Sequence, residues 1–159
     1  MAFGSLSLKA RALRHLARRE HSRAELERRL APYAQDAPEA TGAQQVAAVL
    51  DELAARGLLS DARAAESVLA GAGRRLGTRR IEQALHAKGL APELVDDALA
   101  QARATEYERA LALWRRRFGT PPANLAERAR QSRFLAGRGF DGELIRRLLR
   151  QAGDRADGD

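Results

Sequence analysis

Apolar residues return every three or four positions along most of this chain. Leu26 and Leu30 show the spacing, and so do Ile81 and Leu85. Residues spaced in this way share one face of a helix, where they can pack against a neighbour. No segment alternates apolar and polar residues for long enough to make a convincing strand. The pattern therefore predicts an all-α protein.

Capping signals divide the pattern into nine predicted helices. Three sequences match a capping box, in which a Ser or Thr side chain and a Glu or Gln three residues later bond to each other's backbone. These are Ser22 with Glu25, Thr41 with Gln44, and Thr105 with Glu108. Single caps are expected at Ser60, Asn124 and Asp141, and glycine stops at Gly57, Gly89 and Gly119. The stretch from Gly71 to Gly77 is expected to be a flexible loop between two helices.

The helical pattern repeats after a shift of about 50 residues. Under this shift Ala84, Leu85, Lys88, Gly89 and Leu90 align with Phe134, Leu135, Arg138, Gly139 and Phe140. The next helix agrees as well, with Leu94, Val95, Ala98 and Leu99 matching Leu144, Ile145, Leu148 and Leu149. The beginning of the chain is a weaker copy. We therefore expect three tandem three-helix modules, at 1–59, 60–102 and 103–153, followed by a disordered tail at 154–159.

Modules of this size are near the lower limit for folding alone, so neighbouring modules should support one another. The cores should also be thin, because only 4% of the residues are aromatic and many of the apolar ones are alanine. Both points predict an elongated, curved row. Such a row offers one extended surface, which suits an extended partner better than a small ligand.

Charge and composition narrow the class of function. The net charge is +7, and almost all of the positive charge is arginine. This surplus favours polyanions or acidic protein surfaces as partners. The alternative is that the arginines only give a well-solvated surface. The absence of cysteine excludes disulfides and thiolate chemistry, and no run of roughly 18 apolar residues could span a membrane. The arginine-rich start resembles a transit peptide but is more simply the first helix.

No arrangement of residues indicates a catalytic or metal site. The three histidines form no metal-binding pattern, and the adjacent carboxylates at Asp96 and Asp97 diverge on a helix. The Gly71–Gly77 segment has Leu76 where a phosphate-binding glycine motif needs its last glycine. We therefore expect no enzyme activity, no metal and no cofactor. Trp114, Phe118, Phe134 and Phe140 could stack on bases, but their helical spacing favours core packing.

Basic clusters are the best candidates for binding. Arg74, Arg75, Arg79 and Arg80 surround a helix start, where positive charge is locally unfavourable, so we expect them to serve a partner. Arg115–Arg117 end a helix, where the helix dipole explains them about as well as binding to a partner does. The predicted partner-binding residues are Arg74, Arg75, Arg79, Arg80, Lys88, Arg133, Arg138, Arg146 and Arg147.

Three segments, taken in order, resemble the RecX family. They are LKARALRHLARREHSRAELERRL, GLLSDARAAESVLAGAGRRLGTRRIEQALHAKGL and RQSRFLAGRGFDGELIRRLL, and the resemblance spans roughly residues 8–150. Each motif is moderately specific, and their order at repeat spacing is more so. One departure is that the family usually has an aromatic residue where this chain has Ala64 or Ala65.

The resemblance implies a cytoplasmic regulator in DNA repair, recombination and the SOS response. It would bind RecA filaments on single-stranded DNA and inhibit the RecA recombinase, ATPase and co-protease activities. The alternative from the residues is a basic helical module that binds DNA directly. In either case we expect a monomer, because no heptad seam or long apolar stripe is left over.

Overall fold

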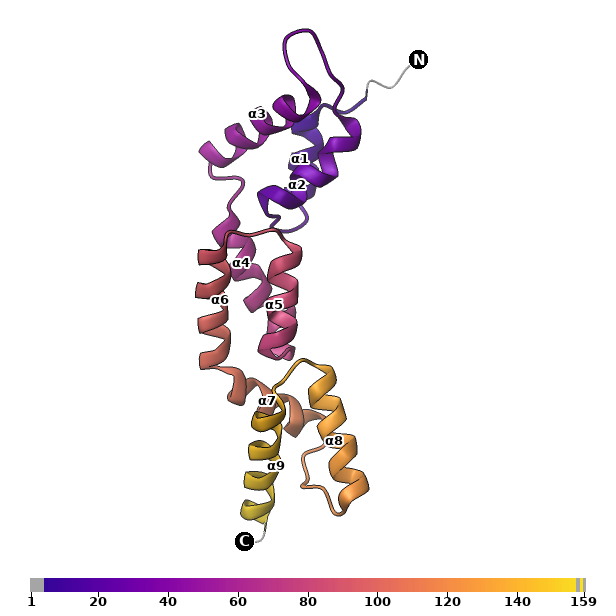
Figure 1. Ribbon diagram of the computed structural model, residues 1–159, viewed down its shortest axis with the longest axis vertical. Helices are drawn as coiled ribbons and strands as arrows, with labels where there is room; N and C mark the ends of the chain where they lie inside the picture. The colour runs from indigo at the N-terminus through magenta and orange to yellow at the C-terminus, as the bar shows by residue number, and fades with distance from the viewer. Residues whose placement is uncertain (1–4, 157, 159) are drawn as a thin grey trace. The chain divides into compact units, whose positions relative to one another are not determined.

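The computed structural model describes residues 5–156 and 158 and contains nine α-helices within them (Figure 1). They are α1 (Leu8–Leu16), α2 (Arg23–Leu30), α3 (Gly42–Ala55), α4 (Asp61–Ala70), α5 (Thr78–Ala87), α6 (Pro92–Ala104), α7 (Glu106–Arg117), α8 (Leu125–Gly137) and α9 (Gly142–Ala156). Two short 3-10 helices, η1 (Ala31–Tyr33) and η2 (Ala72–Arg75), join them. The one β feature in the described residues is an isolated bridge between Ala37 and Ala40. The all-α prediction is confirmed.

Two of the three predicted capping boxes are confirmed. The Ser22 and Thr41 side chains accept bonds from the backbone N–H of Glu25 and Gln44, whose side chains bond back. The third is wrong, since Thr105 makes no side-chain cap. Because α6 continues to Ala104, Thr105 joins two helices, and its backbone angles (φ −113°, ψ 6°) are not the extended ones of an N-cap. Its hydroxyl instead accepts a hydrogen bond from Nε of Arg109, at 3.1 Å.

Contacts divide the chain into two compact units. Unit 1 comprises residues 1–67 and 87–94, and unit 2 comprises residues 68–86 and 95–159. Unit 1 contains α1, α2 and α3, which pack around a core of leucines with smaller residues between them. The buried members are Ala12, Leu26, Leu30, Val46, Leu50, Leu53 and Leu59.

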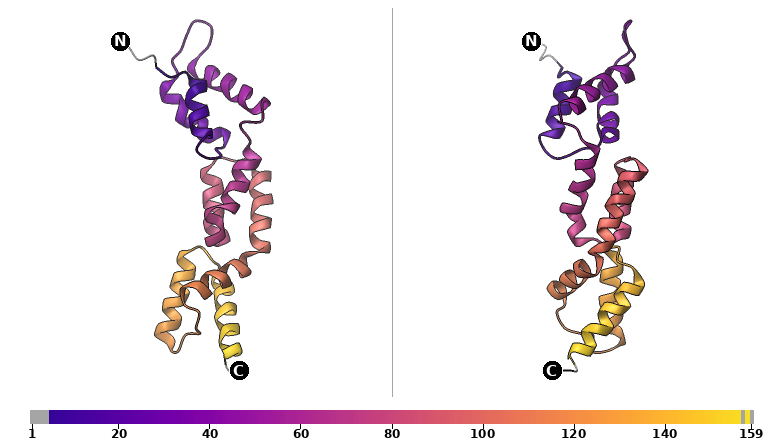
Figure 2. Two further views of the ribbon diagram at one scale, coloured as in Figure 1. Left: turned by 180° about the vertical axis from the view of Figure 1, so that it is seen from behind. Right: turned by 90° about the vertical axis from the view of Figure 1, so that its left-hand side faces the viewer.

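Unit 2 contains α7, α8 and α9, which lie against one another in every view (Figure 2). Their core is built on Trp114 and Phe140 and completed by aliphatic residues from all three helices. The buried aliphatic members are Ala110, Leu135, Ile145, Leu148 and Leu149. Trp114 is 5% exposed, and its indole N–H donates to Oε1 of Gln131 at 2.8 Å. Core packing is therefore confirmed for Trp114 and Phe140.

The repeat is visible in the turns between helices. Gly89 and Gly139, one in each unit, both have positive φ angles, of 63° and 90°, as expected where a glycine stops a helix. The residue before each glycine presents its backbone carbonyl to the start of an earlier helix. In unit 1 the carbonyl of Lys88 accepts from the Ser22 hydroxyl, and in unit 2 that of Arg138 accepts from the Gly77 N–H.

The end of the chain differs from expectation. Helix α9 continues to Ala156, so residues 154–156 of the expected tail are helical. Residues 157 and 159 lie outside the described part.

Ala64 and Ala65, at the family's aromatic position, are both buried. Among the described helices, none is long and apolar enough to cross a membrane.

Candidate arginine-rich binding surface

The segment before α5 is held in place by a half-buried arginine. Arg109, on α7, donates from Nη1 to the Gly73 carbonyl at 3.1 Å and also to the Leu76 carbonyl. Its Nη2 donates to the Ala102 carbonyl at 2.6 Å. Burial lowers the pKa of Arg109 from its ordinary value. The expected flexible loop is therefore an ordered turn, because one guanidinium fork bonds carbonyls from two segments.

Arg79 and Arg80 serve the structure of unit 2. Their Nη2 atoms donate to the carbonyls of Ala136 and Gly137 in the last turn of α8, at 3.2 and 3.1 Å. The charges are unfavourable at the start of α5, but they lie against the negative end of α8, which they stabilise. An internal partner thus explains the position that had suggested an external one.

Lys88 is also engaged inside the fold. Its Nζ lies 3.2 Å from Oε2 of Glu25, and the two side chains are only 13% and 12% exposed. Glu25 also accepts from the Ser22 backbone N–H at 2.8 Å and from Arg19 at 3.1 Å. Burial alone would raise the pKa of Glu25, but these hydrogen bonds outweigh it and lower the pKa to about 2. Lys88 is therefore a poor candidate for partner binding.

The most concentrated free charge in unit 2 surrounds a hollow of about 270 Å³, which we call the arginine hollow. Arg75 comes from η2, Arg116 and Arg117 from the end of α7, and Arg138 from the end of α8. The remaining lining residues are Leu113 and Phe134. In the described part of the chain, none of the four arginines is paired with a carboxylate. Four like charges around one depression repel one another, so an anion bound there would be stabilised.

Two phenylalanines orient the guanidinium groups at this hollow. Phe118 and Phe134 meet edge to face, with their ring centroids 5.4 Å apart. The Arg138 guanidinium lies 5.2 Å from the Phe134 centroid, and that of Arg117 lies 5.5 Å from Phe118 and 5.7 Å from Phe134. A guanidinium on an aromatic face keeps its in-plane N–H groups available for phosphate or carboxylate oxygens. The phenylalanines, half-buried, are packing residues that also support the arginines.

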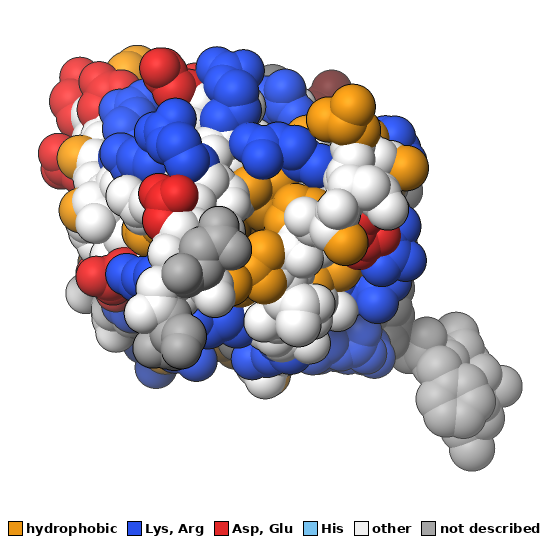
Figure 3. Space-filling model, turned by 90° about the horizontal axis from the view of Figure 1, so that it is seen from below, with side chains coloured by type: hydrophobic (Ala, Val, Ile, Leu, Met, Phe, Trp, Pro, Cys, Tyr) orange, Lys and Arg blue, Asp and Glu red, His pale blue; other side chains and the backbone are white. Residues whose placement is uncertain are grey.

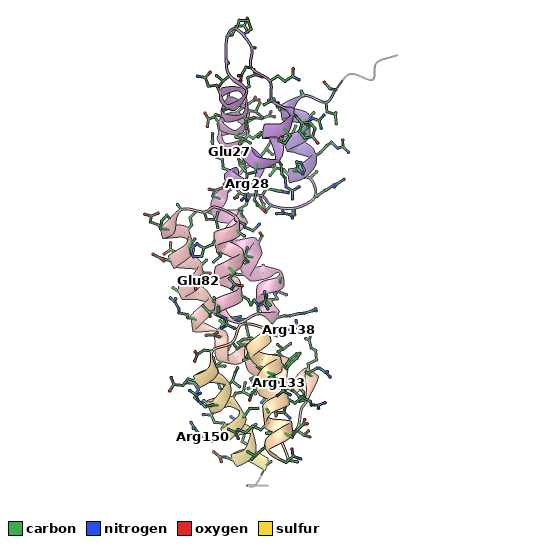
Figure 4. The ribbon with its side chains drawn as sticks, turned by 45° about the vertical axis from the view of Figure 1, so that its right-hand side comes forward. Glu27, Arg28, Glu82, Arg133, Arg138 and Arg150 are labelled. Carbon is green, nitrogen blue, oxygen red and sulfur yellow. The ribbon has the colours of Figure 1, made fainter. Side chains whose placement is uncertain are left out.

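The other predicted site residues lie apart from this hollow. Arg74 and Arg133 are exposed. Figure 4 labels Arg133 on α8, Arg138 at the end of α8 and Arg150 on α9. Arg146 and Arg147 line a different depression that also contains Asp141 and Glu143. The two carboxylates reduce the positive potential there, so an anion bound in this depression would be stabilised less than one bound in the arginine hollow.

The histidines offer no clear chemistry. His15 and His21 lie with ring centroids 5.5 Å apart in unit 1. Desolvation is the main cause that lowers the pKa of each, and neighbouring arginines add to it, so both rings favour the neutral form. No group of three or more potential metal ligands occurs among the residues that the structure describes.

Sequence reasoning missed two features of this surface. It treated Arg115–Arg117 as separate from the Arg74–Arg80 cluster, whereas Arg75 shares a hollow with Arg116 and Arg117. It also gave Arg109 no role. Residue spacing could not reveal either, because both depend on which helix end meets which turn in the folded unit.

Two family models match this chain. The model described as the RecX third three-helix domain matches residues 104–149, and that of the RecX second three-helix domain matches residues 60–99. Together they cover more than half of the chain.

Curated relatives are similar over nearly the whole length. A protein named Regulatory protein RecX from Leptothrix cholodnii is 53% identical over 154 residues, covering 97% of this chain and 94% of the relative. One of the same name from Ralstonia nicotianae is 48% identical, covering 92% of this chain and 89% of the relative. The crystal structure of RecX from Lactobacillus salivarius aligns with a TM-score of 0.71 at 18% identity, covering 92% and 94% of the two chains. This last likeness supports the fold.

Proposed function

The chain belongs to the RecX family, and on that premise we propose that it binds RecA filaments on single-stranded DNA and inhibits their recombinase, ATPase and co-protease activities. Its relatives carry the name of a regulatory protein, which supports a regulatory role. In this proposal it acts as a cytoplasmic monomer in DNA repair, recombination and the SOS response. Family membership is the observation that carries the proposal.

The arginine hollow is the surface that we assign to the filament. It combines four unpaired guanidinium groups with aromatic support, and an acidic protein face or a DNA backbone would satisfy them. Arg74 is exposed beside Arg75 in the chain but does not line the hollow, so it is not part of this assignment. Arg79, Arg80 and Lys88 are left out of this assignment because their side chains bond within the units.

The test is RecA ATPase activity on single-stranded DNA at increasing concentrations of this protein. The natural chain should lower the rate, and a variant with Arg75, Arg116, Arg117 and Arg138 all changed to alanine should need at least tenfold more protein for the same effect. Several charge-assisted contacts of about 1 kcal/mol each account for such a loss. If the natural chain leaves the RecA ATPase rate unchanged at every concentration, the proposal is contradicted.

A matched control removes the same amount of charge elsewhere. Arg14, Arg18, Arg56 and Arg103 are exposed and lie outside the hollow. Their alanine variant should inhibit nearly as well as the natural chain. If both variants fail equally, net charge and not the hollow is responsible.

The second candidate is direct binding to DNA, which the unpaired arginines also favour. Binding to bare single-stranded DNA and to RecA-coated DNA, each at two salt concentrations, distinguishes the two. Pure phosphate binding weakens steeply with salt. Equal affinity for bare and coated DNA, with a steep salt dependence in both, would favour the second candidate.

A further inference from the structure

A second hollow, of about 240 Å³, lies on the α7–α8–α9 bundle of unit 2, and we call it the apolar hollow. Carbon-rich side chains from α7, α9 and the connection after α7 form most of its lining. They are Tyr107, Leu111, Trp114, Pro121, Leu148 and Ala152. Figure 3, a view of the chain from its C-terminal side, shows hydrophobic side chains gathered in a hollow with Lys and Arg side chains on several sides.

The charged residues of this lining are all positive. Arg115 and Arg155 lie at the ends of α7 and α9, and no carboxylate is among the lining residues. Both arginines are exposed, and neither is paired with an acidic side chain in the described residues. The site therefore offers an apolar floor with a positive rim.

We propose that the apolar hollow binds an acidic segment of another protein that inserts a bulky apolar side chain. A volume of this size holds one or two side chains, whereas cofactor pockets are roughly 300–1,000 Å³ and enclose most of the ligand. A central apolar anchor with a charged rim is the arrangement in which a few residues carry most of the binding energy. This proposal goes beyond the proposed function, because it names a second surface and does not depend on RecA.

Two other occupants fit less well. A second copy of this chain would bring Arg115 and Arg155 against the same charges of its partner, in a protein of net charge +7. Single-stranded DNA would need an exposed aromatic face for stacking, but Trp114 is only 5% exposed and its N–H is already bonded to Gln131. Phosphates are also better served by the four arginines of the arginine hollow.

Trp114 is the only tryptophan of the chain, so its fluorescence reports on this site. The probe is a short synthetic amphipathic helix with glutamate on one face and leucine on the other. It should shift the Trp114 emission in a saturable way. Peptides in which lysine replaces glutamate, or alanine replaces leucine, should bind at least tenfold more weakly, as should oligo(dT).

Variants of the full chain then locate the site. Ala152→Leu fills the hollow without removing a contact, and Arg115→Glu with Arg155→Glu reverses the rim, so each should weaken the peptide at least tenfold. Arg103→Glu with Arg150→Glu makes the same charge change outside the hollow and should leave peptide affinity within about twofold. Circular dichroism checks that each variant folds. If Ala152→Leu fails to fold, the rim variant still tests the site.

Several results would overturn the proposal. One is an unchanged Trp114 spectrum with the glutamate–leucine peptide. Others are equal binding of the lysine peptide, a stronger response to oligo(dT), or equal losses in the rim and control variants. Emission that changes with the concentration of the protein alone would assign the surface to a second copy.

Discussion

Glu25 offers the sharpest test of how unit 1 is held together. Its carboxylate accepts hydrogen bonds from the Ser22 backbone, Arg19 and Lys88, and it is only 12% exposed. In the folded protein its pKa falls from 4.5 to about 2. A difference of this size corresponds to about 3 kcal/mol of stability at neutral pH. Glu25→Gln should lower the unfolding free energy by most of that amount, because the neutral amide no longer pairs with Lys88 and leaves that charge buried without a partner.

The pH dependence has a definite sign. Between about pH 4.5 and pH 2 the unfolded chain binds a proton at Glu25 that the folded chain does not, so stability falls as the pH is lowered through this window. Urea unfolding followed by circular dichroism measures the effect for the natural chain and for Glu25→Gln. Other carboxylates titrate in both proteins, so the difference between the two unfolding free energies isolates Glu25. This difference should shrink as the pH falls.

Glu27→Gln is the matched control on the same helix. Glu27 pairs with Arg23 on the surface and is 49% exposed, so its loss should change the unfolding free energy by less than about 1 kcal/mol. If Glu25→Gln proves no more harmful than Glu27→Gln at neutral pH, the bonds to Lys88 and Ser22 do not hold the unit together. A constant difference between the natural chain and Glu25→Gln down to pH 2 would refute the pKa reasoning.

Two further predictions concern unit 2. Gly77→Ala should lower the unfolding free energy by at least about 2 kcal/mol in urea, because a Cβ there would lie 2.2 Å from the backbone of Gly139, whereas Gly137→Ala meets nothing within 4 Å and should be harmless. Arg109→Lys should speed hydrogen exchange at the amides of Arg74 and Leu76, since lysine cannot replace the forked contacts to the turn; unchanged exchange would show that the turn is stable without them.

The local part of the fold could be predicted from the sequence because it depends on local physics. The Ser22 and Thr41 capping boxes involve residues three apart, and the glycine stops depend on a single backbone angle. The capping box predicted at Thr105 was wrong for a reason that lies outside its own four residues. The preceding helix α6 continues to Ala104, so Thr105 never adopts the extended backbone that an N-cap needs.

The binding surface could be predicted only in part. The composition indicated that arginine matters, and Arg75 and Arg138 are both among the expected site residues and line the same hollow. Their grouping with Arg116 and Arg117 was not predictable, because it joins the ends of α7 and α8 to a turn far earlier in the chain. The helix dipole explains Arg116 and Arg117 locally, but it does not bring them to Arg75.

The repeat itself explains why charge alone was a poor guide. The carbonyl of Ala87, the last residue of α5, accepts a hydrogen bond from Arg28 at 2.9 Å, and the carbonyl of Gly137, the last residue of α8, accepts one from Arg80 at 3.1 Å. In each unit, then, an arginine of an earlier helix satisfies the carbonyl that a helix end leaves unpaired. A chain that repeats this contact needs basic residues at helix ends whatever it binds. Arginines with no such internal acceptor, as in the arginine hollow, are therefore the ones whose replacement should separate binding from stability.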